Sequence, residues 1–557
     1  MTSPERPAFG FTPQNPLVGT PRRGTTSSIT PLLAIPFALL LAGTPALAAH
    51  SAQAEPAPSS VPTVPTVPSV PSDSKPIPDG ERIARQVCSG CHQFPEPDLL
   101  DRTTWEVQIL PRMETRLGVS PPDYSSAPEG ELLRSLGIYP KEPLIPRSDW
   151  DAIVDYYLAR APVEPIPQDP RPDIRLGLPG FRFEPARTRF SPALTTLVQV
   201  GPLTRTWYLA DEGARSLVLL DEKGRRTDAL ALDQVAVGVE ETTHGLFVTC
   251  VGSFLPSEIQ KGSLVFFPRD GRGFGAAKVL VNQLPRVAHS EFADLDGDGD
   301  TDVAMCLFGN HRGRFSWFRN LGDDRFREEI LIEKSGAIRS LARDLDGDGT
   351  IDLALLMAQE SETFQVFTNA GNGTFQSVPV FQRPPVHGHN HFEIADIDRD
   401  GRDDLLVSNG DNGEFTSPPK RYHGLRIHRG LGGGRFDETA AWFFPLNGAT
   451  KALARDFDGD GDLDIAAISY FPDYERSPRE SFVHLENRGA WNFAPTTFQQ
   501  CIAGRWLTLD AGDIDGDGDI DLVLGSYIRG PTAAPGFLTR TWEKNGPSAV
   551  ILRNTLR

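Results

Sequence analysis

Cysteine is scarce in this sequence of 557 residues: there are five, and Cys250, Cys306 and Cys501 stand singly. Three isolated thiols form at most one disulfide, so a fold stapled by disulfides is excluded, and we expect each to be a small buried apolar residue. Long apolar runs are scarce too. The run over residues 32–41 is too short to cross a bilayer comfortably, so we expect no membrane span in the mature chain.

Positive charge is also in short supply. The formal net charge is −19, with 55 basic against 74 acidic residues, and no stretch forms a basic face. Nucleic acid is therefore not an expected partner. The sequence also lacks a nucleophile elbow, a phosphate-binding loop and a dinucleotide fingerprint, so hydrolytic and ATP-dependent activities are not expected.

The segment Cys88-Ser89-Gly90-Cys91-His92 carries the most specific chemistry. Two thiols two residues apart, followed directly by a histidine, form the attachment pattern of a c-type haem, because the thiols become thioethers and the imidazole binds the iron. A zinc half-site or a thioredoxin-like pair would need a second Cys/His pair nearby or a βαβ context, which the sequence lacks. We therefore expect one covalent haem c.

Residues 79–165 are expected to form a small all-α domain around this motif. Three amphipathic stretches predict helices, and Pro111 predicts a kink or break in the second, residues 103–117. A helix that carries the motif and a later helix rich in aromatic residues resemble the small cytochrome c fold. Met113 is the only methionine in this region and is the candidate sixth iron ligand by elimination. The alternative is that Met113 packs in the core and the iron is ligated otherwise.

The preceding residues predict export. Residues 1–48 combine a polar start containing Arg22 and Arg23, a short apolar run and small residues at a potential cleavage site, which indicates a signal peptide; an uncleaved membrane anchor is the alternative. Residues 49–78 are rich in Pro, Ser, Val and Ala, which favours an extended linker. We expect a periplasmic or secreted protein.

From residue 166 onward, short β-type runs alternate with Gly, Asn, Asp and Pro, and an Asp-rich segment recurs at intervals of 50 to 60 residues. A repeat of this length with several strands predicts a β-propeller over residues 166–557. Two earlier units without the Asp-rich segment, at about 185–235 and 236–285, bring the expected number of blades to seven. We call the five Asp-rich segments Asp loops 1 to 5; they begin at Asp294, Asp344, Asp396, Asp456 and Asp513.

Each Asp loop predicts a calcium site. Carboxylates stand at positions 1, 3, 5 and 9 with glycine at position 6, and alternating oxygen ligands on a tight turn suit a hard cation, as in an EF-hand. Such crowded carboxylates repel one another without a metal, so we expect binding of up to five Ca²⁺ ions to be coupled to local folding; solvated turns without metal are the alternative. The expected ligands are Asp294, Asp296, Asp298, Asp302, Asp344, Asp346, Asp348, Asp352, Asp396, Asp398, Asp400, Asp404, Asp456, Asp458, Asp460, Asp464, Asp513, Asp515, Asp517 and Asp521.

These repeats resemble the FG-GAP repeats, also called VCBS repeats, of the integrin α-type propellers. The resemblance covers residues 280–557 directly and residues 166–280 by continuation, and it implies that the loop aspartates bind calcium as a structural ion. Asp loop 3 has Arg399 and Arg402 where the other loops have small or uncharged residues, which implies a weaker site. The whole layout resembles exported cytochromes fused to an FG-GAP propeller.

His387, His389 and His391 alternate along the chain. On a strand they would share one face, where three imidazoles could ligate copper or zinc. We favour the alternative, a polar loop or channel lining without metal.

Two functions are compatible with these features. The first is an exported electron-transfer protein with one haem c, whose propeller docks a redox partner protein or an extracellular ligand. The second is a haem-coupled oxidoreductase, a dehydrogenase whose propeller oxidises a small molecule or sugar. The tryptophan-docking repeats of quinone-dependent propellers are not evident, and we assign no catalytic residue.

Overall fold

The computed structural model describes most of the chain from residue 79 onward. The expected signal peptide (1–48) and linker (49–78) lie outside the described residues. No described helix has the length and apolar character needed to cross a membrane. The described residues are 79–125, 129–271, 273–412, 419–530, 532 and 534–556.

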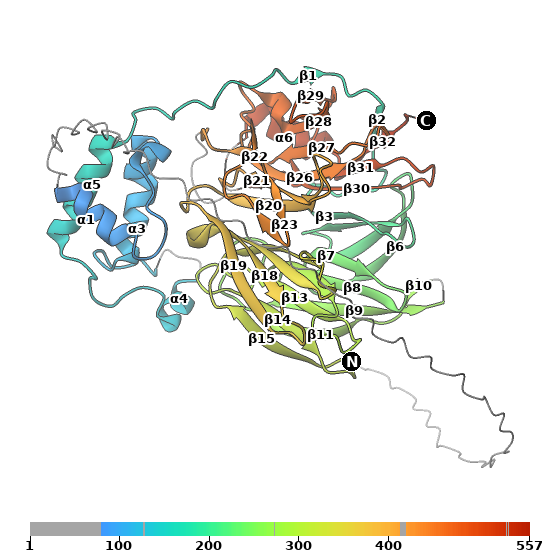
Figure 1. The fold of residues 1–557 in the computed structure, drawn as a ribbon, viewed down its shortest axis with the longest axis horizontal. Helices are drawn as coiled ribbons and strands as arrows, with labels where there is room; N and C mark the ends of the chain where they lie inside the picture. The colour runs from blue at the N-terminus through green and yellow to red at the C-terminus, as the bar shows by residue number, and fades with distance from the viewer. Residues whose placement is uncertain are drawn as a thin grey trace, which may run out of the picture. The chain divides into compact units, whose positions relative to one another are not determined.

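Seven β-sheets form the blades of a β-propeller (Figure 1). The first strands of neighbouring blades contact one another in a closed ring that runs through β3, β7, β12, β16, β20, β26 and β30 and returns to β3. The seven-bladed propeller predicted from the repeat is therefore confirmed, including the two blades without an Asp loop.

The strands of each blade pair antiparallel in chain order, apart from the edge strands described below. Blade 1 contains β3 (Thr195–Val200), β4 (Trp207–Asp211), β5 (Ser216–Leu220) and β6 (Arg226–Ala231). Blade 2 contains β7 (Ala236–Glu241), β8 (Gly245–Cys250), β9 (Gly262–Asp270), β10 (Gly273–Phe274) and β11 (Lys278–Leu284). Blade 3 contains β12 (Val287–Ala293), β13 (Asp302–Leu307), β14 (Arg314–Asn320) and β15 (Phe326–Ile332). Blades 4 and 5 contain β16 (Ala337–Arg343), β17 (Asp352–Met357), β18 (Thr363–Asn369) and β19 (Phe375–Gln382); and β20 (His389–Ala395), β21 (Asp404–Asn409), β22 (Gly424–His428) and β25 (Trp442–Pro445). Blades 6 and 7 contain β26 (Ala449–Arg455), β27 (Asp464–Ser469), β28 (Phe482–Asn487) and β29 (Phe493–Thr497); and β30 (Trp506–Gly512), β31 (Asp521–Ser526) and β32 (Ala549–Asn554). Short connections contain the hairpin β23 (Gly430–Gly432) and β24 (Arg435–Phe436), the 3₁₀ turns η3 (Gln359–Ser361) and η4 (Pro478–Ser481), and α6 (Gly536–Asn545).

Alternating side chains of the second strands hold neighbouring blades together. Val303 and Met305 of β13 pack with blade 2, whereas Ala304 and Cys306 of the same strand pack with blade 4. A strand with apolar neighbours on both faces is buried along its whole length, as β13 is. This explains the continuous apolar run after each Asp loop and the burial of Cys306.

The ring is closed by a segment that precedes blade 1 in the sequence. β2 (Phe181–Pro185) pairs antiparallel with β32 and becomes the outer strand of blade 7. β1 (Arg175–Leu176) pairs parallel with β29 at the edge of blade 6. Blade 7 therefore combines strands from both ends of the propeller sequence.

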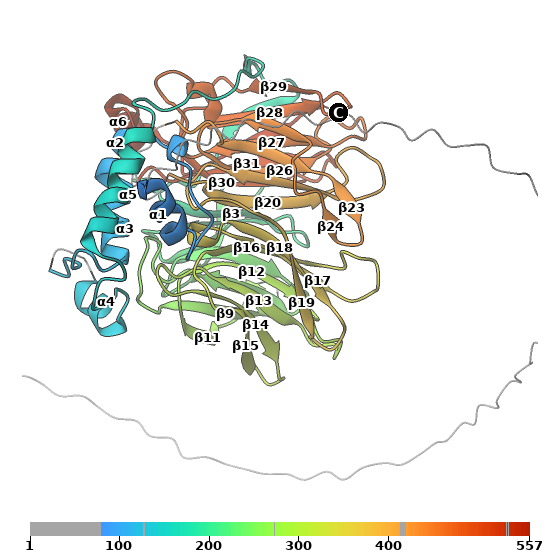
Figure 2. The same cartoon turned by 60° about the vertical axis from the view of Figure 1, so that its left-hand side comes forward.

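Residues before β1 form short helices. α1 and α5 contact each other and lie side by side in both views (Figures 1 and 2). These helices belong to the same compact unit as the propeller, residues 74–557. The expectation of a separate small all-α domain is therefore corrected: among the described residues, no independent cytochrome domain is delimited. The helical elements are α1 (Asp79–Cys88), η1 (Pro97–Leu99), α2 (Arg102–Thr104), η2 (Trp105–Ile109), α3 (Leu110–Arg116), α4 (Gly130–Leu136) and α5 (Arg147–Arg160).

Pro111 does not end its helix. η2 is a π-helical turn, in which the Leu110 N–H donates to the Trp105 carbonyl, and Pro111 lies in the first turn of α3. The wider turn accommodates a residue that lacks an N–H and crowds the preceding turn.

Candidate functional site

The Cys-X-X-Cys-His segment follows α1 directly. Cys88 is the last residue of the helix, and both Cys88 and Cys91 are free thiols. Burial raises the pKa of the Cys88 thiol to about 11, which disfavours the thiolate that a zinc site or a redox disulfide requires.

His92 has one ring nitrogen already oriented. Its Nδ1 lies 2.9 Å from the Gln93 carbonyl oxygen, an interaction that holds the proton on Nδ1 and leaves Nε2 as an acceptor. Two side chains fix the chain just beyond it: the Tyr157 hydroxyl donates to the Pro95 carbonyl at 2.8 Å, and the Trp105 indole donates to the Pro97 carbonyl at 2.8 Å.

The helices enclose a core with many incompletely covered apolar side chains. Ten partly buried hydrophobic residues surround this cluster, more than border any of the other eight clusters; Met113, Val87 and Phe94 are among them. Tyr422 and Val386 of the propeller belong to the same cluster. Met113 therefore borders an apolar core that blade 5 helps to cover, whereas Cys88 is partly buried and Cys91 is exposed.

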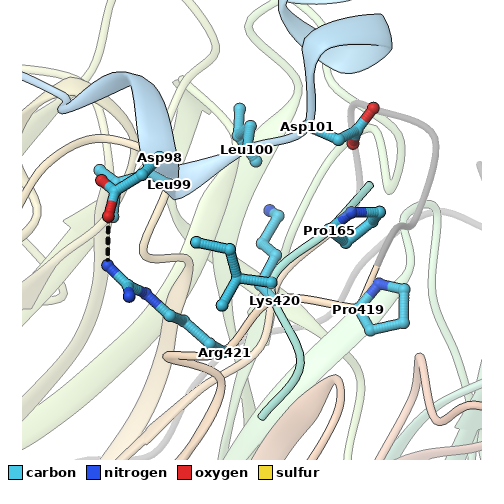
Figure 3. Close-up of a pocket in the computed structure, with 9 residues that line it drawn as sticks. Asp98, Leu99, Leu100, Asp101, Pro165, Pro419, Lys420 and Arg421 are labelled. Carbon is cyan, nitrogen blue, oxygen red and sulfur yellow. Dashed lines mark hydrogen bonds and ion pairs between the residues drawn. The ribbon is translucent and has the colours of Figure 1, made fainter. Parts of the chain in front are cut away.

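Polar contacts also join this segment to blade 5 (Figure 3). Asp98 and Arg421 form an ion pair at 2.7 Å, and the Lys420 side chain extends toward Leu100. The cavity between them measures about 10 Å³, which is room for about one water molecule. This cavity is a packing defect at a contact and is too small for a substrate.

Each Asp loop joins the first and second strands of its blade, and a shared hydrogen-bond pattern shapes it. In Asp loop 1, Asp294 at position 1 accepts the backbone N–H groups of Gly297 at 2.8 Å and Gly299 at 2.9 Å. Both glycines have positive φ angles, 76° and 92°, which other residues rarely adopt. In every loop, three carboxylates have oxygen atoms within 4.8 Å of one another, an arrangement that could hold calcium.

The aspartate at position 9 is the buried part of each loop. Asp302 is the first residue of β13 and accepts the N–H of Leu295 at 3.2 Å and of Asn320 at 2.7 Å. The equivalent Asp521 accepts the N–H of Ile514 at 3.2 Å and of Asn554 at 2.8 Å. Burial raises the pKa of both carboxyls to about 6. A bound cation would favour the ionised form of these groups.

Arginines also lie beside carboxylates in four of the five loops, contacts that the sequence did not predict. Arg319 lies 2.5 Å from Asp296, and Arg553 lies 2.5 Å from Asp521. Arg429 lies 3.7 Å from Asp398, and Arg399 of Asp loop 3 lies 3.8 Å from Asp462 of Asp loop 4. The available sequence signal for Arg319, Arg429 and Arg553 is a position directly before the Asn or Gly at the end of the third strand, which is weak because arginine is common on surfaces.

The three histidines of the 387–391 stretch do not converge. His387 stacks on Tyr422 with ring centroids 4.5 Å apart, and His389 Nδ1 lies 2.6 Å from Glu362. Both ring nitrogens of the buried His391 lack a hydrogen-bond partner in the described part of the chain. A positive φ at Gly388 and a register shift between residues 389 and 391 break the two-residue alternation. Among the described residues, the three-histidine metal site is not assembled.

The three single cysteines fit the expectation of small buried residues. Cys250, Cys306 and Cys501 are buried, and the structure contains no disulfide among the five described cysteines. Burial raises the pKa of Cys250 and Cys306 to about 12.

The comparisons with known proteins include solved structures of low sequence identity. Among the solved structures that match, the N-terminal domain of Nup159 is 9% identical with a TM-score of 0.39, covering 69% of this chain and 99% of that chain. Sqt1 of Saccharomyces cerevisiae is 8% identical with a TM-score of 0.40, covering 66% and 98% respectively. The Cps50 (Swd1) beta-propeller domain of Myceliophteria thermophila is 11% identical with a TM-score of 0.33, covering 49% and 80%. At these values the likenesses carry no functional inference. No curated protein matches the chain.

A family model is more informative. The model described as FG-GAP-like repeat matches residues 294–355 and 344–407. These ranges begin at Asp loops 1 and 2 and extend into the second strand of the following blade. The chain therefore carries FG-GAP-like repeats within a seven-bladed β-propeller.

Proposed function

We propose that the protein is an exported electron-transfer protein, with one haem c attached through Cys88 and Cys91 and a calcium-stabilised propeller that docks a partner. The observation that carries the proposal is the Cys-X-X-Cys-His segment at the end of α1, with two free thiols and a histidine whose Nε2 is left available. When bound, the haem supplies one-electron chemistry at the iron.

The chain's own residues have separate tasks in this proposal. His92 presents Nε2, because the Gln93 carbonyl holds Nδ1. Tyr157 and Trp105 anchor the carbonyls of Pro95 and Pro97 and so hold the segment after the motif in place. The apolar cluster excludes water from the region beside Cys88.

Met113 is the proposed sixth ligand. It lies on α3 at the border of the apolar cluster that contains Val87 and Phe94. Met/His ligation raises a haem reduction potential, so replacing Met113 is expected to lower it. The alternative ligation state has Met113 packing on the cluster only.

Calcium in the Asp loops is proposed to be a structural ion. FG-GAP repeat propellers often bind Ca²⁺, and the donor set consists only of oxygen atoms, which suits this cation. The proposed role for the ring of blades is a rigid recognition surface in the periplasm or outside the cell.

A pair of cysteine variants tests the haem proposal. The protein is purified from a host that attaches c-type haem, and its pyridine haemochrome spectrum and mass are measured. We expect one covalent haem in the wild type and none in the C88S/C91S double variant. The C250S variant is the control, because Cys250 is buried in the propeller, and it should retain the haem. A wild-type preparation with the mass of the bare polypeptide would refute electron transfer through haem.

A second candidate is a haem-coupled dehydrogenase. Two buried polar side chains beside the helical segment favour it. The Tyr422 hydroxyl and both ring nitrogens of His423 have no hydrogen-bond partner among the described residues. Both groups are typical of proton transfer to or from a substrate. Haem reduction by a sugar or alcohol alone would favour this candidate, and reduction only by electron donors would favour the carrier.

A further inference from the structure

The five Asp loops share one fold but differ at one neighbouring position. At the end of the third strand of each blade, one backbone N–H donates to the position-9 carboxylate of the loop at 2.7–2.9 Å. The residue just before this donor is therefore structurally equivalent in all five blades. This residue is Arg319 in Asp loop 1, Thr368 in loop 2, Arg429 in loop 3, Glu486 in loop 4 and Arg553 in loop 5.

In Asp loop 5 this residue, Arg553, places its guanidinium beside two of the loop carboxylates. Arg553 Nη1 lies 2.5 Å from Asp521 Oδ2 and 3.2 Å from Asp515 Oδ2, so it joins positions 9 and 3. The Arg553 side chain is only 5% exposed. Its other nitrogens are held by the Glu222 carbonyl and lie 3.8 Å from Glu184. The guanidinium is therefore tethered on both sides and has no free path to solvent.

A second arginine reaches the same loop from blade 1. Arg205 Nη2 lies 4.0 Å from Asp513 Oδ2 at position 1, and its guanidinium lies where a side chain on Gly516 would be. Asp loop 5 thus has cations beside positions 1, 3 and 9.

The other loops are more open. Arg319 contacts Asp296 and Asp298 but is 33% exposed, and Arg429 is 51% exposed and 3.7 Å from Asp398. In Asp loops 2 and 4, Thr368 and Glu486 replace the arginine. Among the described residues, no lysine or arginine lies within 4.0 Å of the carboxylates at positions 1, 3, 5 and 9 of these two loops. In Asp loop 4, the 58% exposed Arg399 lies 3.8 Å from Asp462 at position 7, and His484 Nε2 lies 3.6 Å from Asp464 at position 9.

We propose that Arg553 is a built-in cation that replaces calcium in Asp loop 5, and that Asp loops 2 and 4 are the ones that require the ion. The inference deepens the calcium part of the proposed function and rests on it. Calcium binds carboxylate oxygens at 2.3–2.6 Å. The carboxylates of Asp loop 5 that could hold an ion together are Asp513, Asp515 and Asp517, and Arg553 Nη1 lies 3.2 Å from Asp515 Oδ2, so the ion would lie beside the guanidinium. The buried arginine cannot move away, and the repulsion between the two cations excludes the ion.

Two matched variants test this proposal on the full-length haem-containing chain. Asp513→Asn and Asp344→Asn remove the position-1 carboxylate from Asp loops 5 and 2, and both keep a side chain of the same shape. Bound calcium per chain is counted by elemental analysis after dialysis against a calcium buffer. We expect D344N to lose one calcium ion per chain and D513N to lose none. Loss of one ion in D513N, or of none in D344N, would overturn the proposal.

Transplanting the arginine gives an independent check. Thr368→Arg places a guanidinium beside Asp loop 2, and we expect at least tenfold weaker calcium binding there with an unchanged circular dichroism spectrum. Arg553→Met is expected to gain one calcium ion per chain, and a chelator should remove that ion. If R553M fails to fold, the count in D513N and D344N still decides. Five equivalent ions in the wild type would refute the inference alone, whereas no bound calcium would refute the calcium role as well.

Discussion

At the residue scale, the position-9 aspartates have a role that does not depend on a metal. Asp352 is fully buried and accepts the N–H groups of Leu345 at 3.0 Å and Asn369 at 2.8 Å. It therefore joins the loop to the third strand of its blade. Asp348, at position 5 of the same loop, is exposed, and its carboxylate accepts the N–H and the hydroxyl of Thr350.

Removing the buried carboxylate should destabilise the protein even without calcium. Asp352→Ala leaves two N–H donors, one buried and one partly buried, without a partner, at about 1–3 kcal/mol each, so we expect a loss of about 2–6 kcal/mol in the free energy of unfolding. The measurement is urea denaturation in EDTA. Asp348→Ala is the control and should change the stability in EDTA by less than about 0.5 kcal/mol. Equal effects of the two variants would contradict the assigned role.

A partly buried glutamate in the ring of first strands should make stability depend on pH. Burial on β12 raises the pKa of Glu291 from 4.5 to about 7. The folded state thus holds this proton more tightly than the unfolded state, so the group's contribution is fully present below pH 4.5 and is lost as the pH rises to about 7.

The Glu291→Gln variant should remove this dependence. In saturating calcium at pH 8, we expect E291Q to be more stable than wild type by about 1–3 kcal/mol. Near pH 5, the two proteins should have nearly the same free energy of unfolding. Denaturation midpoints at the two pH values provide the measurement. A difference from wild type that stays the same at pH 5 and pH 8 would show that Glu291 does not titrate in this range.

At the element scale, features encoded in consecutive residues could be predicted from the sequence, whereas pairings between distant segments could not. In the five blades that contain an Asp loop, the loop and the apolar run after it predicted the turn and the buried second strand, because both signals lie within a few consecutive residues. The closing strand β2 was not foreseen, since its partner β32 lies at the other end of the propeller sequence. The turn at Gly388 likewise depends on backbone geometry and separates His387, His389 and His391.

The closing strand should contribute to the stability of the whole ring. Phe181 and Phe183 pack against the cluster between blades 6 and 7, whereas Arg182 between them is exposed. Replacing both phenylalanines by alanine removes apolar contacts and is expected to lower the free energy of unfolding by about 2–4 kcal/mol. The expected loss is moderate because both side chains are only partly buried. The control R182A, on the opposite face of the same strand, should be nearly neutral. Unchanged thermal unfolding of F181A/F183A would argue against closure by β2.

At the scale of the whole molecule, the net charge of −19 is concentrated partly in the Asp loops. Cations bound in the loops would reduce this repulsion in the folded state only, so calcium should stabilise the protein. Each site contributes about 2.7 kcal/mol when free calcium is 100 times its dissociation constant.

Chelation is therefore expected to lower the melting temperature. Thermal unfolding with EDTA, compared with millimolar calcium, gives the measurement, and magnesium at the same concentration is the control because it favours stricter octahedral geometry. Identical melting curves in calcium and EDTA would remove the structural role of calcium and leave the aspartates as solvated turns.

The pairing of β2 with β32 also sets an order of assembly. Synthesis proceeds from the N-terminus, so the Cys88–Cys91 pair is available long before Ala549–Asn554 exists to shut the circle. The final strand of the seventh blade is therefore the last part of the ring to be made, and the ring can close only after the helices and the first six blades exist.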